Sequence, residues 1–518
     1  MPVPARSVYF CEDHAMFRET ARKFMEQEVA PHADAWEAER RIPRAIWQRM
    51  GEMGFLGLVG PESHGGMDAD VFFSIAFLEE LPRSRMGGFT AAVTVHGFIA
   101  TNAIRDHGTD DLKQRYLAPS ITGEKLAAIC ISEPDAGSDV AALRTSAVRD
   151  GDHWVINGAK TWITNGVYAD FHVVACKTDK DAGAGGISLI VVDTDTPGVS
   201  SSKLNKMGWH SSDTAEIAYE NVRVPLGNLI GEENAGFRYI MQTFAFERLS
   251  AATTSIGSCD LALEETLAYM KTREAFGRPI AKFQALRHRL ADMFTEVEAA
   301  RQLCYHTAWL HQNGVPAVKE SSQAKLLASE LSKRVADECL QFFGGFGFVE
   351  EYPMARFYRD ARVGTIVAGT SEIMREIIAK VEVDGVDFGR PREKKVHQAP
   401  AAPAPVAQAA EVAPNTVPEL FLSLPTRLRP EKTEGLRTRV HFQFPGSAWT
   451  VEIDGPLCQV QEGLHGEPAC VVQSTEEVYL DLEAGRESPE MAFMTGKVKI
   501  SNPLVMQQFA RSFRRIAR

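Results

Sequence analysis

The chain has 518 residues, which allows several domains with cores of their own. Its hydrophobic content of 44% and charged content of 24% are close to the average for soluble globular proteins. A formal net charge of −12 argues against a nucleic-acid-binding protein, which usually needs a basic surface. The cysteines form no C-x-x-C pair, so we expect no metal site, no dithiol redox centre and a reducing, cytoplasmic location. We also expect no secretory signal and no membrane span, because no apolar run is suited to either.

The first part of the chain is predicted to be helical. Residues 1–120 carry apolar side chains at helical spacing, with charged residues between them. Near Leu126 the pattern changes to short β-branched runs bounded by turns, so residues 121–230 are predicted to form a mostly antiparallel β domain. Within this domain, Asn157-Gly158 between apolar flanks predicts a hairpin turn.

Long amphipathic helices return in residues 231–383 and predict a bundle. An Ala- and Pro-rich stretch, Gln398 to Asn415, marks residues 384–416 as an extended linker. Residues 417–518 follow as a module of ordinary domain size. Its alternating strands, such as "AWTVEIDG", predict a small α/β domain with one half-buried sheet. The predicted fold class is therefore multidomain α+β.

Two segments carry the marks of a ligand site, and the first combines two neighbouring strands. "ICISEPDAGSD", Ile129 to Asp139, is a strand followed by an acidic, glycine-containing loop, and "TWITNG", Thr161 to Gly166, adds a tryptophan and a threonine. Such a surface can stack an aromatic ring system and form hydrogen bonds with its edge. A β-turn beside a core tryptophan explains the same residues about as well.

The second segment is "QFFGGFGFVEEYPMARFYRDAR", Gln341 to Arg362. Its glycines allow the backbone to approach a ligand closely. They follow a helix rather than a strand, so they differ from the glycine-rich turn of a dinucleotide-binding fold. The alternative interpretation is a plain loop between two helices.

Together the two segments resemble the signature motifs of the acyl-CoA dehydrogenase family, and the resemblance covers about residues 10 to 382. It implies that family's fold: a helical N-terminal domain, a β-barrel-like middle domain and a four-helix-bundle domain. It also implies non-covalent FAD, a homotetramer or homodimer, and α,β-dehydrogenation of an acyl-CoA thioester. Electrons would pass to electron-transfer flavoprotein.

The resemblance assigns contacts residue by residue. The flavin ring and its edge would meet Ile129, Ile131, Ser132, Gly137, Ser138, Trp162, Ile163 and Thr164. The FAD of a neighbouring subunit would be reached by Arg273, Phe276 and Gln284, the adenosine and pyrophosphate would be held by Gln341, Gly344 and Gly345, and Thr370 and Glu372 would also contact the FAD. The acyl-CoA would be contacted by Ser138, Phe244, Arg248, Ala368 and Gly369.

The position of the catalytic base departs from the commonest family pattern. Many members carry a glutamate immediately before the Gly-Thr of "AGTSE", where this chain has Ala368. Either the enzyme is inactive or the acid has moved. Isovaleryl-CoA and long-chain acyl-CoA dehydrogenases carry it on an earlier helix in a Glu-Arg-Leu context, which here is Glu247-Arg248-Leu249. The resemblance thus assigns catalysis to Glu247, supported by Arg248 and by the Ala368 N–H on the thioester oxygen.

The residues around Glu247 support this assignment independently. Glu247 shares one helical stripe with Ile240, Phe244, Ala251 and Thr254, so its carboxyl group is expected to lie among apolar or small side chains. Desolvation in such a place raises a carboxyl pKa toward that of a working base. The alternative is a partly exposed Glu247 paired with Arg248, but consecutive helical residues do not face each other.

Glu372 is predicted to belong to a helix start and not to the chemistry. It follows Thr370 or Ser371 as the N-cap, where a negative charge suits the helix dipole.

The substrate is predicted to be a medium- to long-chain acyl-CoA, with branched short-chain (isovaleryl-type) substrates second. An oxidase, which would release peroxide in air, is one alternative. A lipid-binding protein with a vestigial dehydrogenase core is another.

Residues 417–518 are similar to the sterol carrier protein type 2 domain, on the order of their elements and the "MTGKVKI" segment. That fold has an apolar tunnel for acyl chains or sterols. Phe493, Met494, Trp449 and Val498 are candidates to line it, and an ordinary core is the alternative for each of them.

A lipid carrier joined to the dehydrogenase by a linker is expected to raise the local substrate concentration. Deletion of residues 396–518 should then raise the apparent KM for long acyl-CoAs, measured in steady-state assays. Unchanged kinetics would contradict this role.

Overall fold

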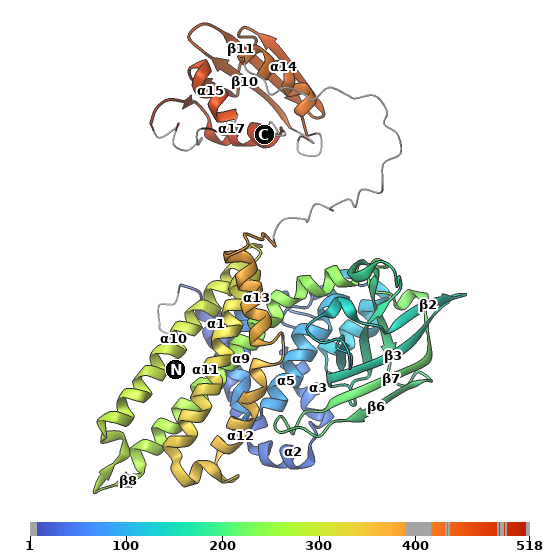
Figure 1. The fold of residues 1–518 in the computed structure, drawn as a ribbon, viewed down its shortest axis with the longest axis vertical. Helices are drawn as coiled ribbons and strands as arrows, with labels where there is room; N and C mark the ends of the chain where they lie inside the picture. The colour runs from blue at the N-terminus through green and yellow to red at the C-terminus, as the bar shows by residue number, and fades with distance from the viewer. Residues whose placement is uncertain are drawn as a thin grey trace. The chain divides into compact units, whose positions relative to one another are not determined.

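The structure is a computed structural model that describes residues 8–388, 416–429, 433, 436–483, 486, 492 and 495–513. The chain divides into two compact units, residues 1–393 and 394–518, which are described separately. Figure 1 shows helices on one side of the larger unit and a sheet on the other. No helix of the described residues is long and apolar enough to cross a membrane.

The larger unit begins with helices, as predicted. α4 is apolar on all sides and deeply buried, and the Asp70 carboxylate caps it by accepting a hydrogen bond from the Phe72 N–H at 2.8 Å. The helices are α1 (Glu12–Phe24), α2 (Ala33–Glu39), α3 (Arg44–Glu52), α4 (Val71–Glu80), α5 (Gly87–Val95), α6 (Asn102–His107), α7 (Asp110–Leu112) and α8 (Ala118–Ile121).

A mostly antiparallel sheet follows, in the order β1-β4-β2-β3-β7-β6 with β5 paired to β4. Its central strands are apolar on both faces, because one side packs on the helices and the other has an apolar cluster of its own. The strands are β1 (Ala127–Cys130), β2 (Ser146–Asp150), β3 (His153–Thr164), β4 (Phe171–Lys177), β5 (Ile187–Asp193), β6 (Val199–Lys203) and β7 (Thr214–Pro225).

The hairpin predicted at Asn157-Gly158 is wrong. β3 continues through both residues, and the register against β7 shifts between Ile156 and Gly158. Tertiary contacts override the local turn preference: the side-chain Oδ1 of Asn157 accepts from the Asn221 N–H at 2.8 Å, and a Cβ on Gly158 would lie 2.7 Å from the Thr145 Cα. The dipeptide marks a β-bulge against a close backbone approach. The β2–β3 turn lies earlier, after Asp150.

The second helical part packs around one long helix. α9 contacts α4, α10 and α11, and α5 contacts β1, β3 and α12, so α5 lies between the sheet and the bundle. The elements are α9 (Gly236–Thr272), β8 (Glu274–Ala275), β9 (Arg278–Pro279), α10 (Gln284–Gln312), α11 (Val318–Phe343), α12 (Pro353–Ala361) and α13 (Ser371–Glu382).

A buried ion network joins these two helical parts. Arg301 of α10 donates to Glu79 of α4 at 3.0 Å and to both oxygens of Asp260 of α9 at 2.7 and 2.8 Å. The Tyr305 hydroxyl donates to Glu79 at 2.9 Å, and Arg18 of α1 lies 2.5 Å from the same carboxylate. Four helices therefore meet at charges that compensate one another away from water.

The smaller unit is an α/β domain whose sheet has the order β12-β11-β10-β13-β14. The Phe421 and Trp449 rings stack at 5.3 Å in its core, and Val498 is buried in the same cluster. Phe493 and Met494 lie outside the described residues. The elements are α14 (Val417–Arg427), β10 (Arg437–Gln443), β11 (Ala448–Asp454), β12 (Leu457–Glu462), β13 (Cys470–Gln473), α15 (Glu476–Glu483), β14 (Lys499–Ile500) and α17 (Pro503–Arg511).

The ion network makes a prediction about stability. Arg301→Met leaves the buried Asp260 carboxylate without its cation and leaves Glu79 with Arg18 alone, so we expect the free energy of unfolding to fall by about 3–5 kcal/mol in urea denaturation. Lys23→Met is the control, because its pair with Glu19 is exposed and we expect a change below about 0.5 kcal/mol. Equal losses in the two variants would show that the network does not stabilise the helical core.

Candidate active site

A cavity of about 1190 Å³ lies in the larger unit between the sheet and the helices. Its walls come from α5, the end of β1 and the loop after it, β3, α9, α11, α12 and the segment before α13. The volume exceeds the usual range for a single ligand site, which is about 300–1,000 Å³. The cavity therefore has room for a large cofactor and a substrate together.

The first wall is the loop that follows β1. Glu133 is buried there with Lys160 of β3, whose ammonium donates to the carboxylate at 2.8 Å and to the Ile131 carbonyl at 3.0 Å. The same carboxylate accepts from the N–H groups of Arg144 and Thr145 at 2.6 and 2.9 Å. Burial alone would raise the pKa of Glu133, but Lys160 and these hydrogen bonds outweigh it and lower the pKa. A buried ion pair thus fixes the shape of the loop.

Trp162 presents an aromatic face on the second wall. The register of β3 against β7 shifts between Lys160 and Ile163, and Trp162 adopts a positive φ of 62°. This bulge turns the indole outward, and the residue is 68% exposed. An uncovered indole beside the hydroxyl of Thr164 suits a flat ring with a polar edge, so this wall fits the FAD that the sequence implies.

Glu247 and Arg248 lie on the α9 wall. Burial raises the pKa of Glu247 to about 7, although Arg248 and Lys325 act to lower it. Burial also lowers the pKa of Arg248, whose guanidinium lies 5.6 Å from the centre of the Phe244 ring. Phe244 and Thr254 line the cavity as the stripe predicted, whereas Ile240 of the same stripe is buried in the apolar core. Glu247 is thus a carboxyl group that gains and loses its proton near neutral pH.

The fourth wall is the turn that leads into α13. Ala368 and Gly369 have φ of 54° and 87°, so two consecutive residues are left-handed. Thr370 is the N-cap of α13, as predicted, and its hydroxyl oxygen accepts from the Ile373 N–H at 3.2 Å. Glu372 is exposed in the first turn of the helix, and its own backbone N–H and then Thr370 lower its pKa. A carboxylate whose pKa is lowered is a weak base and is poorly suited to remove a weakly acidic proton.

The cavity brings together most of the predicted site residues. They are Ile129, Ile131, Ser132, Gly137, Ser138, Trp162, Ile163, Thr164, Phe244, Glu247, Arg248, Ala368, Gly369 and Thr370.

Other predicted residues do not line this cavity: Arg273, Phe276, Gln284, Gln341, Gly344, Gly345 and Glu372. Phe276 lies in the β8–β9 hairpin, drawn in Figure 1 at the far end of α9 and α10, and is 95% exposed. The Arg273 guanidinium lies 5.6 Å from the Phe346 ring centre, which joins the hairpin to the glycine-rich segment after α11. The hairpin and the glycine-rich segment therefore form a second group at the end of the bundle, to which Glu372, in the first turn of α13, does not belong.

Two residues that line the cavity were not singled out from the sequence. Asp360 of α12 accepts from the N–H groups of Gly87 at 3.0 Å and Trp209 at 2.6 Å, and burial raises its pKa to about 7. Lys325 of α11 is 1% exposed and donates to the Gly369 carbonyl at 2.6 Å. The sequence feature that could have indicated Lys325 is its place in "SSQAKLLASELS", where a lysine shares a helix face with small residues.

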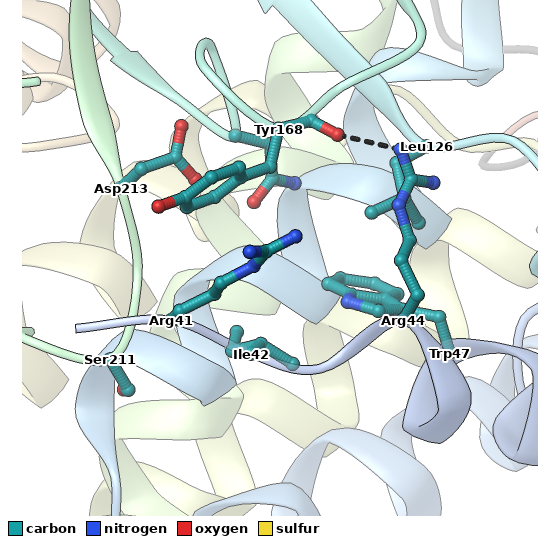
Figure 2. Close-up of a pocket in the computed structure, with 9 residues that line it drawn as sticks. Arg41, Ile42, Arg44, Trp47, Leu126, Tyr168, Ser211 and Asp213 are labelled. Atoms are coloured by element: carbon teal, nitrogen blue, oxygen red, sulfur yellow. Dashed lines mark hydrogen bonds between the residues drawn. The ribbon is translucent and has the colours of Figure 1, made fainter. Parts of the chain in front are cut away.

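A second cavity, shown in Figure 2, measures only about 20 Å³, which is room for about one water molecule. The Arg41 guanidinium lies 4.9 Å from the centre of the Tyr168 ring, and Arg44 donates to the Tyr168 carbonyl at 2.9 Å. This cavity is a small packing gap where the α3 region contacts the sheet.

Comparisons with known proteins agree with the site. Three family models match in order: "Acyl-CoA dehydrogenase, N-terminal domain" at residues 11–124, "middle domain" at 128–222 and "C-terminal domain" at 234–382. The model of the SCP-2 sterol transfer family matches residues 421–514.

Individual relatives cover most of the chain. The long-chain specific mitochondrial acyl-CoA dehydrogenase of Mus musculus is 39% identical over 374 residues, 72% of this chain and 86% of that protein. The short-chain specific acyl-CoA dehydrogenase of Clostridium acetobutylicum is 38% identical over 369 residues, 71% of this chain and 97% of that protein. A chain solved in work on the electron transferring flavoprotein of Acidaminococcus fermentans is 37% identical, with a TM-score of 0.71, and the match covers 73% of this chain and all of that one.

These matches also confirm the predicted fold class, with its helical, β and helical parts and an α/β module at the end. The chain therefore belongs to the acyl-CoA dehydrogenase family of FAD-dependent oxidoreductases acting on CH–CH bonds, and it carries an additional SCP-2 domain.

Proposed function

We propose that the chain dehydrogenates a medium- to long-chain acyl-CoA to the trans-2-enoyl-CoA, with Glu247 as the base. The observation that carries the proposal is the carboxyl group of Glu247 on the α9 wall, whose pKa burial raises to about 7. Asp360 has a similar pKa, but its carboxylate is already held by the N–H groups of Gly87 and Trp209. A base poised near the working pH combines a populated carboxylate with enough basicity to remove a weakly acidic α-proton. Glu372 lacks this property, because it is exposed and its pKa is lowered.

The thioester oxygen needs hydrogen-bond donors, because negative charge develops there as the α-proton leaves. Ala368 supplies a backbone N–H from the opposite wall, and Arg248 adds a buried positive charge beside Glu247. Bound FAD supplies the acceptor for the hydride from the β-carbon. Ile129, Ser132, Trp162 and Thr164 are the residues that we assign to its ring and polar edge.

The shape of the cavity supports a long acyl group. Its lining follows α9 from Glu247 to Glu265, a rise of about 27 Å for 18 residues. Beyond Ala251 the lining includes Thr254, Ser258 and Ala262, whose small side chains leave the bore open. A branched short-chain substrate of the isovaleryl type would leave most of this length unused.

A second copy of the chain is proposed to complete the cofactor site. Phe276 and Phe348 are exposed by 95% and 85%, and Arg273 joins their two segments through Phe346. Large apolar side chains exposed together mark interaction surfaces. We assign this group to the FAD of a neighbouring subunit in a homodimer or homotetramer.

Electron-transfer flavoprotein is the proposed electron acceptor, and one similar chain was solved in work on such a protein. A cytoplasmic location and a lipid or acyl-chain ligand for the C-terminal domain remain part of this proposal.

The base assignment predicts a change in rate and in pH dependence. Only the carboxylate accepts a proton, so kcat/KM should fall as the pH falls through about 7 in the wild type. Glu247→Gln should slow anaerobic bleaching of the flavin by acyl-CoA by about 10²–10⁴-fold. Glu376→Gln is the control, because Glu376 is an exposed carboxylate of α13 paired with Lys380, and it should bleach at nearly the wild-type rate. Bleaching of Glu247→Gln at the wild-type rate would mean that another residue is the base.

The long bore predicts a shift in chain-length preference. Ser258→Phe places an aromatic ring in the α9 wall about 16 Å beyond Glu247. We expect kcat/KM for palmitoyl-CoA to fall by at least about tenfold while that for butyryl-CoA changes little. Ser258→Ala keeps the bore open and is the control. If Ser258→Phe still prefers palmitoyl-CoA, the acyl chain does not follow α9.

A further inference from the structure

Lys325 is a buried cation at the centre of the cavity wall. It lies on the face of α11 that carries Ser322, Ala328 and Ser329, and it is 1% exposed. An ammonium group in such surroundings is unfavourable unless hydrogen bonds and charges compensate it. Its Nζ donates to the Gly369 carbonyl at 2.6 Å, a short, charge-assisted hydrogen bond.

The partner of this bond belongs to a strained turn. Ala368 is left-handed with a φ of 54°, which an alanine adopts only where its surroundings impose it, and Gly369 follows with 87°. A side chain at Gly369 would be strained by this positive φ, and its Cβ would lie 2.6 Å from the Met374 Cε, which would have to move. Thr370 anchors the turn on the α13 side through its cap on Ile373. Lys325 anchors it on the α11 side.

The surrounding charges come from three helices. α9 contributes Glu247 and Arg248, α11 contributes Glu330, and α13 contributes Glu372. Burial lowers the pKa of Lys325 to about 8, and the three carboxylates oppose that fall while Arg248 adds to it. In return the ammonium acts to lower the pKa of Glu247.

We propose that Lys325 is a positioning residue of the dehydrogenation site. Through its bond to the Gly369 carbonyl, its ammonium holds the left-handed turn whose Ala368 N–H is directed at the substrate's thioester oxygen. Lys325 itself contacts neither the reacting atoms nor the proton. The inference rests on the proposed function, which gives the Ala368 N–H its role.

The first test is spectroscopic and does not require turnover. Dodecenoyl-CoA with a ¹³C-labelled thioester carbonyl is bound to each FAD-loaded protein, and the isotope-edited infrared stretch is recorded. Hydrogen bonding weakens the C=O bond, so the wild type should show a stretch lowered from its value in water. Lys325→Met should lose much of that shift, and Lys325→Arg should restore part of it. An unchanged stretch in Lys325→Met would overturn the proposal.

The second test is kinetic. We expect Lys325→Met to lower kcat by about 10–100-fold with a smaller change in KM, because a misplaced donor acts in the transition state. The acid limb of kcat/KM should move to higher pH, since the cation near Glu247 is gone. Lys333→Met is the matched control: it removes an exposed lysine of α11 and should change neither quantity. A rise in KM alone, with kcat unchanged, would argue against a positioning role for Lys325.

Folding is controlled separately through flavin content and the thermal midpoint of each variant. If Lys325→Met does not retain FAD, Lys325→Gln keeps an uncharged donor on a side chain that is one bond shorter. Restoration of the carbonyl shift by glutamine supports the hydrogen-bond role, and failure of glutamine and arginine alike contradicts it. Should the wild type oxidise no acyl-CoA, the proposed function fails, while the infrared comparison still tests Lys325.

Discussion

The site depends on keeping one carboxyl group, that of Glu247, out of bulk water. α9 achieves this because its 37 residues pack on α4, α10 and α11, and the stripe from Phe244 to Thr254 is left facing the cavity. Desolvation raises the pKa of Glu247 to about 7, and Arg248 and Lys325 keep it from rising further. On the proposed assignment of Glu247 as the base, burial makes the group more basic and the two cations limit the rise of its pKa. The buried ion network at Arg301 serves the same end, because it fixes α9 against its neighbours.

Two walls of the cavity share one structural feature. Each contains a non-glycine residue with positive φ, Trp162 on the sheet side and Ala368 on the helical side. Each is near a lysine that is 1% exposed and donates to a backbone carbonyl: Lys160 to Ile131 at 3.0 Å and Lys325 to Gly369 at 2.6 Å. In each case the flexible side chain of a lysine on a strand or helix reaches the backbone of a neighbouring loop or turn. The irregular segment can then hold a strained conformation that its own hydrogen bonds do not specify.

The order of helical, β and helical regions followed from hydrophobic periodicity alone, and the Thr370 cap followed from local sequence. The assignment of Glu247 to the site came chiefly from the family resemblance, and its helical stripe supported a place in the cavity, because the spacing of side chains on one helix is a local property. The wrong hairpin prediction at Asn157-Gly158 arose because contacts distant in the sequence decided the structure there. A turn preference of two residues is weaker than the pairing of a twelve-residue strand with β7, and the contact with Thr145 was not visible in the sequence. Lys325 was missed for a similar reason, since its partner lies 44 residues away.

A sequence motif also does not show whether its residues contact a cofactor bound to the same chain or to another copy of the chain. The flavin motif, Glu247 and Ala368 meet in one cavity, whereas Phe276 and Gly344 lie outside it although both belong to motifs implied for the same cofactor. A cofactor in the cavity covers Trp162 but leaves Phe276 and Phe348 facing solvent in a lone chain. In the proposed assembly, the cavity of a second copy would remove these apolar side chains from water. On that proposal the exposed end of the bundle and the cavity are the two halves of one cofactor site formed by two chains.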